Sequence, residues 1–338
     1  MLETSFRGPV AGFVAGTAYI LVLAGLIALA EAFSLRTLQF VSIAMIVGAP
    51  IAAGVVTLFF ATDEQANTRR SQLLIPWFAV GGWSLISIAL AWETVVCVIM
   101  LIPVFLPLAS LGGFIGGYVR ANHCDLTNRS VVSSFSVLPL LLAVAEIPYD
   151  TPTVHHTVTS SVMVEAPIDQ VWASLPSVAN ITREELPWTL SHFIGIPRPV
   201  SSNTPQLVAG GQRDIQWEQG VRFTETITRI VENELVAYDV TPDQESLKLA
   251  ALDTHIVIGD QYFDVESGQY ALESDGDKTR LSLSTTYRMT TNLNGYGKLW
   301  ANWVMDDFHY SVLRVLKSRN ESAVNISRHS SSSTDLTS

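Results

Sequence analysis

Five long apolar stretches in the first half of the chain limit what it can fold into more than any other feature. They cover residues 10–33, 38–61, 73–91, 94–119 and 131–147. A helix that crosses the hydrocarbon core of a bilayer needs about 20 predominantly apolar residues. The fifth stretch is near the lower limit of that length and contains Pro139. The pattern predicts a transmembrane domain of five helices over residues 1–149.

The second half of the chain differs from the first in its charge. Of the 31 acidic and 20 basic residues, 24 acidic and 14 basic residues lie in residues 149–338, so almost all of the net charge of −11 belongs to that half. Nucleic-acid binding depends on basic residues that displace counterions from phosphates, so we do not expect nucleic acid as a partner. The composition predicts an acidic, water-soluble domain held at a membrane.

The arginines of the short loops indicate which side of the membrane each loop faces. Cytoplasmic loops carry an excess of Arg and Lys. One side holds Arg36 alone, and the N-terminus and alternate loops on the other side hold Arg7, Arg69, Arg70, Arg120 and Arg129. We therefore expect a cytoplasmic N-terminus, at the inner membrane if the source is bacterial. Five crossings place residues 150–338 outside the cytoplasm, whereas a fifth stretch that re-enters leaves them inside it.

Small residues are spaced at intervals of four in the fourth apolar stretch. Gly112, Gly113, Gly116 and Gly117 form two overlapping pairs of this kind. Such pairs allow two helix backbones to approach closely. They predict either packing within the bundle or a homodimer through these four glycines.

The second half has the residue pattern of an α+β domain. Residues 154–165 indicate a strand, and Pro167 suits the first turn of a short helix after it. Alternating apolar residues between turn-like breaks then predict an antiparallel meander, with strands at 213–218, 221–231, 235–241, 254–258, 262–273 and 279–291. A last helix is expected over 295–319, because Trp300, Val304, Phe308, Val312 and Val315 recur at helical spacing. The Ser-rich tail 320–338 is expected to be disordered.

This order of elements resembles the START-like superfamily, also called SRPBCC, which includes the polyketide cyclase and birch-pollen-allergen families. The residues that carry the resemblance are Val162-Met163-Val164-Glu165-Ala166-Pro167-Ile168-Asp169-Gln170-Val171-Trp172 and the closing helix around 300–316. It covers about half the chain, residues 154–319, and the attachment to several spans is similar to bacterial membrane-bound members. The resemblance implies a helix-grip fold, in which a curved antiparallel sheet surrounds a long C-terminal helix, and a cavity for a lipid or another hydrophobic small molecule.

The segment 180–210 departs from that pattern, since four prolines interrupt any regular element. It also contains Trp188, Phe193 and Ile194. The segment is either an irregular connection packed on the core or a lid over the cavity. Aromatic and apolar residues that could bind the ligand are Trp188, Phe193, Trp217, Phe223, Tyr262, Tyr287, Trp300, Trp303, Val304 and Phe308, although the same spacing also fits an ordinary core.

No catalytic signature is present: the chain has no Gly-x-Ser-x-Gly elbow, no phosphate-binding glycine loop and no His-Glu-x-x-His motif. We expect no metal site and no cofactor. The expected function is binding or transfer of a hydrophobic molecule. Two alternatives stay open: a cyclase- or hydrolase-like enzyme, for which His255, Glu225 and Tyr287 are the candidate catalytic residues, and a protein-docking module. His255 and His309 are each either a general base or a hydrogen-bonded core or surface histidine.

Overall fold

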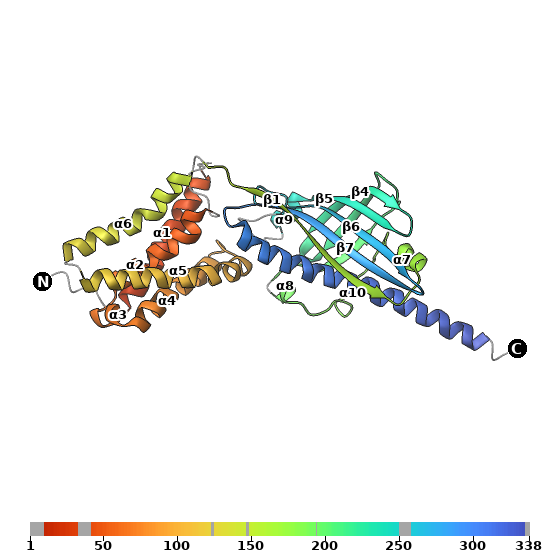
Figure 1. Cartoon of the computed structure of the whole chain (residues 1–338), viewed down its shortest axis with the longest axis horizontal. Helices are drawn as coiled ribbons and strands as arrows, with labels where there is room; N and C mark the ends of the chain where they lie inside the picture. The colour runs from red at the N-terminus through yellow and green to blue at the C-terminus, as the bar shows by residue number, and fades with distance from the viewer. Residues whose placement is uncertain are drawn as a thin grey trace. The chain divides into compact units, whose positions relative to one another are not determined.

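The computed structural model describes residues 10–32, 42–122, 125–146, 149–193, 195–249 and 258–334. The chain forms two compact units. The first consists of Met1–Pro152 with Thr291–Leu293, and the second consists of Thr153–Thr290 with Asn294–Ser338. The first unit is helical and the second contains the sheet (Figure 1).

The helical unit contains three helices that are long and apolar enough to cross a membrane, at Ala11–Ala30, Arg69–Ala89 and Val95–Asn122. Two shorter apolar helices lie at Ala44–Phe60 and Val132–Glu146. The elements of this unit are α1 (Ala11–Ala32), the π-helical segment η2 (Ala44–Gly48), α2 (Ala49–Phe60), α3 (Asp63–Asn67), α4 (Arg69–Ala89), α5 (Val95–Asn122) and α6 (Asp125–Glu146). Each of the five predicted stretches thus contributes apolar helix, and three of them meet the length for a crossing.

Glycines bring helices of this unit into backbone contact. A Cβ atom added to Gly112 of α5 would lie 2.0 Å from the carbonyl oxygen of Ile51 and 3.0 Å from the Cα of Gly54 on α2. A Cβ atom on Gly113 would lie 2.0 Å from the carbonyl oxygen of Gln72 on α4. Gly116 and Gly117 likewise face residues of the same chain. These glycines pack within the bundle, and a homodimer through them stays a prediction.

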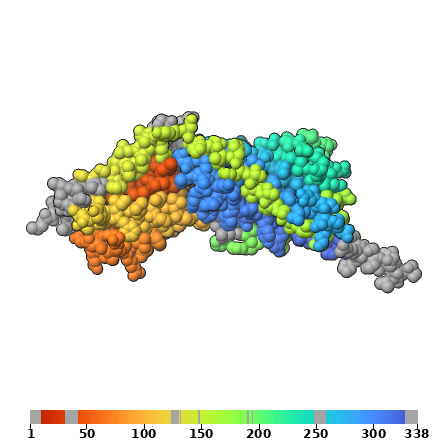
Figure 2. Space-filling model, in the orientation of Figure 1, coloured from red at the N-terminus to blue at the C-terminus, as the bar shows by residue number. Residues whose placement is uncertain are grey.

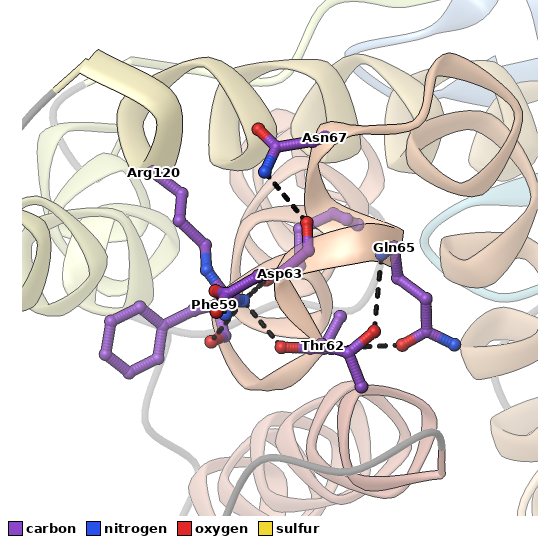
Figure 3. A network of polar contacts seen from close by, with 8 residues as sticks. Phe59, Thr62, Asp63, Gln65, Asn67 and Arg120 are labelled. Carbon is purple, nitrogen blue, oxygen red and sulfur yellow. Dashed lines mark hydrogen bonds and ion pairs between the residues drawn. The ribbon is translucent and has the colours of Figure 1, made fainter. Parts of the chain in front are cut away.

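Arg120 of α5 caps the C-terminal end of α2 (Figure 3). Its Nη1 donates to the carbonyl oxygens of Leu58, Phe59 and Ala61 at 2.9, 3.2 and 2.6 Å. Its Nη2 pairs with Asp63, the first residue of α3. The last carbonyl groups of a helix have no partner within it and carry partial negative charge. A cation at this place therefore stabilises the end of α2 and its connection to α3.

The second unit is built on one seven-stranded antiparallel sheet. Its strands are β1 (Thr153–Val164), β2 (Pro199–Asn203), β3 (Gln212–Trp217), β4 (Arg222–Val231), β5 (Leu235–Pro242), β6 (Phe263–Asp275) and β7 (Lys278–Thr290). The order across the sheet is β1-β7-β6-β5-β4-β3-β2, so β2 to β7 follow chain order and β1 pairs with β7. The helices are α7 (Ile168–Ser174), α8 (Leu190–Phe193), the 3₁₀ turn η3 (Glu218–Gly220), α9 (Gln244–Leu249) and α10 (Asn294–Thr334).

The sheet is curled, and α10 packs on its inward face (Figure 1). Inward side chains alternate along each strand; on β7, for instance, Leu281 and Leu283 are fully buried, whereas Arg280, Ser282 and Ser284 beside them are more exposed. The two leucines belong to the same main core as Leu313 and Leu316 of α10. The predicted fold of this half, a curved antiparallel sheet with a long C-terminal helix, is confirmed. In Figure 2, the yellow-green β1 crosses the surface beside blue residues of the C-terminal part, as its pairing with β7 requires.

The short helices α8 and α9 were not expected from the sequence, and two further elements also differ from the expectation. The proline-containing segment 180–210 contributes the edge strand β2, which pairs with β3 from Pro199 onward. In addition, α10 continues beyond residue 319, because Asn320 is tied to α7: its Nδ2 donates to Ser174 Oγ at 2.9 Å and its carbonyl oxygen accepts from Gln170 at 2.7 Å. Val324 is still part of the core. The strand expected at 254–258 lies outside the described residues apart from Ile258.

Candidate ligand-binding cavity

The curled sheet and α10 enclose a cavity of about 140 Å³. The wall is mainly apolar, and its residues come from β3 to β7 and the turns beside them, from α10, and from α8 with the segment after it. They are Ser191, His192, Ile196, Pro197, Ile215, Trp217, Val221, Phe223, Glu225, Tyr238, Val240, Ile258, Val265, Thr285, Val304, Met305 and Phe308.

A buried ion pair lies at the sheet side of this cavity. Arg213 and Glu225 are inward residues of β3 and β4 in register with each other. Arg213 Nη1 donates to Glu225 Oε2 at 3.1 Å, and the two side chains are 3 % and 14 % exposed. The guanidinium also donates to Thr204 Oγ1 and to the carbonyl oxygen of Leu175. Burial raises the pKa of Glu225 and the charge of Arg213 opposes that rise. Arg213 is thus held by protein groups, whereas Glu225 has carboxylate surface left on the cavity wall.

A tyrosine lies across the sheet next to this pair. Tyr238 of β5 is opposite Gly268 of β6, which in turn is opposite Thr285 of β7. A Cβ atom at Gly268 would lie 2.6 Å from Tyr238 Oη, so the phenol occupies the space that a side chain would fill. Burial raises the pKa of Tyr238 well above its ordinary value, and its hydroxyl stays protonated as a donor. The missing side chain at Gly268 therefore places a phenol hydroxyl on the cavity wall between β4 and β7.

A chain of hydrogen bonds orients Thr285 at the same wall. Ser160 Oγ donates to Asp306 Oδ1 at 3.1 Å, so its oxygen accepts from Nδ1 of His309 at 3.0 Å. A neutral imidazole then accepts at Nε2, where Thr285 Oγ1 lies at 2.8 Å. Burial lowers the pKa of His309 to about 4 and keeps the ring neutral near pH 7. Thr285 donates to His309 and presents oxygen lone pairs to the cavity, while His309 itself is a hydrogen-bonded core residue.

The segment around α8 covers one side of the cavity. Ser191 donates from both its backbone nitrogen and its hydroxyl to Asp307 Oδ2 of α10, the first at 3.1 Å. This connection holds Ser191 and His192 at the cavity wall. Trp188 and Phe193 of the same segment point away and are 74 % and 73 % exposed, with ring centroids 6.4 Å apart. The segment is packed on α10 through a carboxylate, and its largest aromatic side chains lie on the surface.

The structure brings five of the sequence-predicted residues to the cavity: Trp217, Phe223, Glu225, Val304 and Phe308. It does not bring the others there. Tyr287 is fully buried beneath Met305, and its hydroxyl donates to Asn302 Oδ1 at 2.7 Å. Trp300 and Trp303 pack against each other with centroids 5.8 Å apart. Tyr262 is absent from the cavity wall, and His255 lies outside the described residues.

Sequence reasoning missed Arg213, Tyr238, Gly268 and Thr285. The sequence held one signal, which concerned Gly268 and its neighbour: a glycine inside a strand often marks a close approach of another group. Gly268 is such a glycine, and Tyr238 is the group that approaches. Within the described residues, no three His, Cys, Asp or Glu side chains lie close enough together to hold a metal ion.

No protein-family model and no curated protein matches the chain. Solved structures match about half of it. An uncharacterized protein from Rhizobium leguminosarum aligns with a TM-score of 0.29 and 13 % identity, over 51 % of this chain and 99 % of the other. Truncated norcoclaurine synthase from Thalictrum flavum aligns with a TM-score of 0.27 and 13 % identity, over 49 % and 98 %. DynU16, a protein of the dynemicin biosynthetic locus, aligns with a TM-score of 0.28 and 15 % identity, over 49 % of each chain.

At TM-scores of this size, these similarities carry no argument about what this chain does. Its own geometry defines a domain in which a curled antiparallel sheet and a C-terminal helix enclose an apolar cavity. That arrangement is the one that the START-like resemblance implies.

Proposed function

We propose that this chain is a membrane-tethered START-like protein whose second half binds or transfers a lipid or another hydrophobic small molecule. The observation that carries the proposal is the cavity of about 140 Å³ between α10 and the sheet. Small-molecule sites are typically apolar cavities with a few placed polar groups. Here the polar groups on the wall include Glu225, Tyr238 and Thr285.

These polar groups favour a ligand with one hydrogen-bonding group on an apolar body. Tyr238 donates, and Glu225 and Thr285 offer acceptor oxygens, so a hydroxyl group or a carbonyl group finds a partner there. An apolar body fills the rest of the wall, which consists of aliphatic and aromatic side chains such as Val265 and Val304. The ligand's polar group would then lie over Gly268.

The experiment is a comparison of bound molecules in the full chain and in a variant whose cavity is filled. Both proteins are purified in lipid nanodiscs of one synthetic phospholipid, extracted with organic solvent and analysed by mass spectrometry. We expect a molecule enriched with the wild-type chain and absent from Val304→Trp, because the indole occupies the cavity. Ile326→Trp, at a position that is 71 % exposed, is the matched control and should keep it. Equal extracts from all three proteins would contradict the proposal.

We take the tether to be the five apolar stretches, three of which form helices long and apolar enough to cross a membrane. If all five cross, the arginine distribution supports a cytoplasmic N-terminus, and the second half lies outside the cytoplasm. Alkaline phosphatase fused after Pro152 should then be active in a bacterial host. An inactive fusion together with an active cytoplasmic reporter at the same position would reverse this orientation.

A second candidate function is an enzyme of the cyclase or hydrolase type. It is favoured by one observation: Glu225 and Tyr238, a carboxylate and a phenol, lie at the same cavity wall. The raised pKa of Tyr238 makes the phenol a weak acid, which favours binding over proton transfer. Loss of turnover of the extracted molecule in Glu225→Gln, with its binding retained, would favour the enzyme.

The docking-module alternative has the exposed pair Trp188 and Phe193 in its favour, but the domain interior is not solid.

A further inference from the structure

A second, smaller cavity of about 60 Å³ adjoins the first. Its wall is formed by α10 beyond Phe308, by the sheet near β2 and β3, and by the segment after α7. The lining residues outside the first cavity include Leu175, Val178, Ile181, Arg213, Tyr270, Val312, Val315 and Leu316. Five residues line both cavities, namely Ile215, Trp217, Glu225, Tyr238 and Phe308. These five residues are the boundary between the two spaces.

Two of these five boundary residues form a pair of stacked rings. Trp217 comes from the last position of β3 and Phe308 from α10. Their ring centroids are 5.1 Å apart and their planes differ by 29°. Because one ring reaches in from the sheet and the other from the helix, the stack spans the space between them. We name Trp217 and Phe308 the ring partition.

The members of the boundary differ in how firmly they are held. Glu225 is bound by Arg213 at 3.1 Å, and Tyr238 lies between the Arg213 guanidinium, 5.6 Å from its ring centroid, and Gly268. Trp217 has ring contacts with Phe223 and Phe308, but its buried Nε1 has no hydrogen-bond partner among the described residues. Turning the indole breaks no hydrogen bond of that nitrogen.

An unpaired buried donor also destabilises the arrangement that contains it. A rotated indole that donates to a ligand or to the Glu225 carboxylate removes this cost. Two observations thus concern the same side chain: Trp217 lines both cavities, and its Nε1 has no hydrogen-bond partner among the described residues. They distinguish Trp217 from an ordinary core tryptophan, whose N–H usually has a partner.

We propose that the ring partition determines the length of ligand that the protein accepts. A short apolar chain occupies the larger cavity alone, whereas a longer single chain displaces the rings and places its end in the smaller cavity, against Val312 and Leu316. The ligand class is a single-chain amphiphile whose polar group binds near Tyr238 and Thr285. This inference rests on the proposed function and adds the selecting residues.

The test uses two alcohols, hexanol and dodecanol, each carrying an alkyl diazirine at the end remote from the hydroxyl. The full chain in nanodiscs is irradiated with each probe, and labelled peptides are identified by mass spectrometry. We expect the hexanol probe to label the larger cavity, around Val265, and the dodecanol probe to label α10 around Val312 and Leu316. Partition of each alcohol into lipid is the same for every variant, so affinities from labelling saturation are compared as ratios between variants.

Removing one ring should favour the long probe. In Trp217→Ala, the affinity for dodecanol relative to hexanol should rise about tenfold, the effect of burying roughly two more methylene groups. Phe308→Ala removes the other ring and should act in the same direction, which covers the case that one variant does not fold. Ile326→Ala, at a position of α10 that is 71 % exposed and lines neither cavity, is the control and should leave the ratio unchanged.

The labelling results distinguish a failure of the length-selection inference from a failure of the proposed function. If hexanol labels the larger cavity, but dodecanol never labels Val312 or Leu316 in any variant, the ring partition does not select length. An unchanged ratio in both ring variants, with hexanol binding retained, overturns the inference in the same way. If neither alcohol labels either cavity in the folded wild-type chain, the proposed function fails, and the ring partition fails with it.

Discussion

Replacing Arg213 by Met should destabilise the second unit much more than replacing both Arg213 and Glu225 by apolar residues. In the single variant Arg213→Met, the Glu225 carboxylate stays buried without its cation. In the double variant Arg213→Met with Glu225→Leu, neither charge remains, and the new side chains resemble the removed ones in volume. The comparison shows whether the ion pair itself stabilises the fold, or whether each buried charge is tolerated only because its partner is present.

The magnitude follows from the burial of the pair. The side chains are 3 % and 14 % exposed, so water screens them little. Breaking a buried pair by removing one partner costs about 3–5 kcal/mol, whereas exchanging both for apolar groups is often neutral or stabilising. The single variant also loses the hydrogen bonds to Thr204 and Leu175. We therefore expect a loss of about 4 kcal/mol in the single variant and about 1 kcal/mol or less in the double variant.

The pH dependence gives a second, independent readout. The pKa of Glu225 is already raised above its ordinary value of 4.5 by burial, and removing Arg213 raises it further. A carboxyl group with a raised folded-state pKa favours folding below its unfolded pKa, and this stability is lost as pH rises through the folded-state value. The deficit of Arg213→Met should therefore shrink as the pH is lowered from 7 towards 4.5, and the double variant should show no such change.

The assay is hydrogen exchange of the full chain in nanodiscs, followed by mass spectrometry of peptides from β3 and β4. Exchange of these amides reports the free energy of opening the sheet, after correction for the intrinsic rate at each pH. A single variant within about 1 kcal/mol of wild type, or a double variant as unstable as the single one, would refute the reasoning.

Three further predictions concern other parts of the molecule. Gly112→Ala should destabilise the helical unit by about 2 kcal/mol, because the added Cβ would lie 2.0 Å from the carbonyl oxygen of Ile51. Gly81→Ala is the control and should not destabilise it, because no atom lies within 4 Å of that added Cβ. For both variants, the rate at which a thiol reagent modifies the buried Cys97 measures the destabilisation. The pKa of His309 is lowered from 6.5 to about 4, so its neutral ring contributes stability above pH 6.5 that is lost as the pH falls towards 4. The full loss of unfolding free energy is about 3 kcal/mol. His309→Gln should lack this loss when unfolding is followed as a function of acid pH. Gly268→Ala should displace the phenol of Tyr238 and weaken retention of the bound molecule about tenfold in a folded protein, as measured by mass spectrometry of extracts.

The order of the elements could be read from the sequence because it depends on local patterns. The strand 154–165 appears as β1 at Thr153–Val164, and the helical stripe from Trp300 to Val315 lies within α10. Period-two alternation identifies the inward face of a strand, and four of the predicted ligand residues on the sheet or α10 do reach the cavity wall: Trp217, Phe223, Val304 and Phe308.

The same patterns could not place a residue along its strand relative to the helix above it. Tyr287 and Thr285 both face inward on β7, yet only Thr285 lines the cavity, because Met305 and Asn302 of α10 cover Tyr287. Which inward residue is covered depends on the curl of the sheet and the position of α10, and both arise from contacts between distant residues.

The sequence by itself determined that the first half is apolar helix and that the second half is an acidic sheet-and-helix domain, since hydropathy and periodicity are local properties of the chain. Only the tertiary structure decided that Arg213 pairs with Glu225, that Gly268 makes room for Tyr238, and that Trp217 meets Phe308. Each of these contacts joins different strands, or a strand and α10. Sheet register and helix packing set such contacts, and no local pattern in one segment specifies its partner.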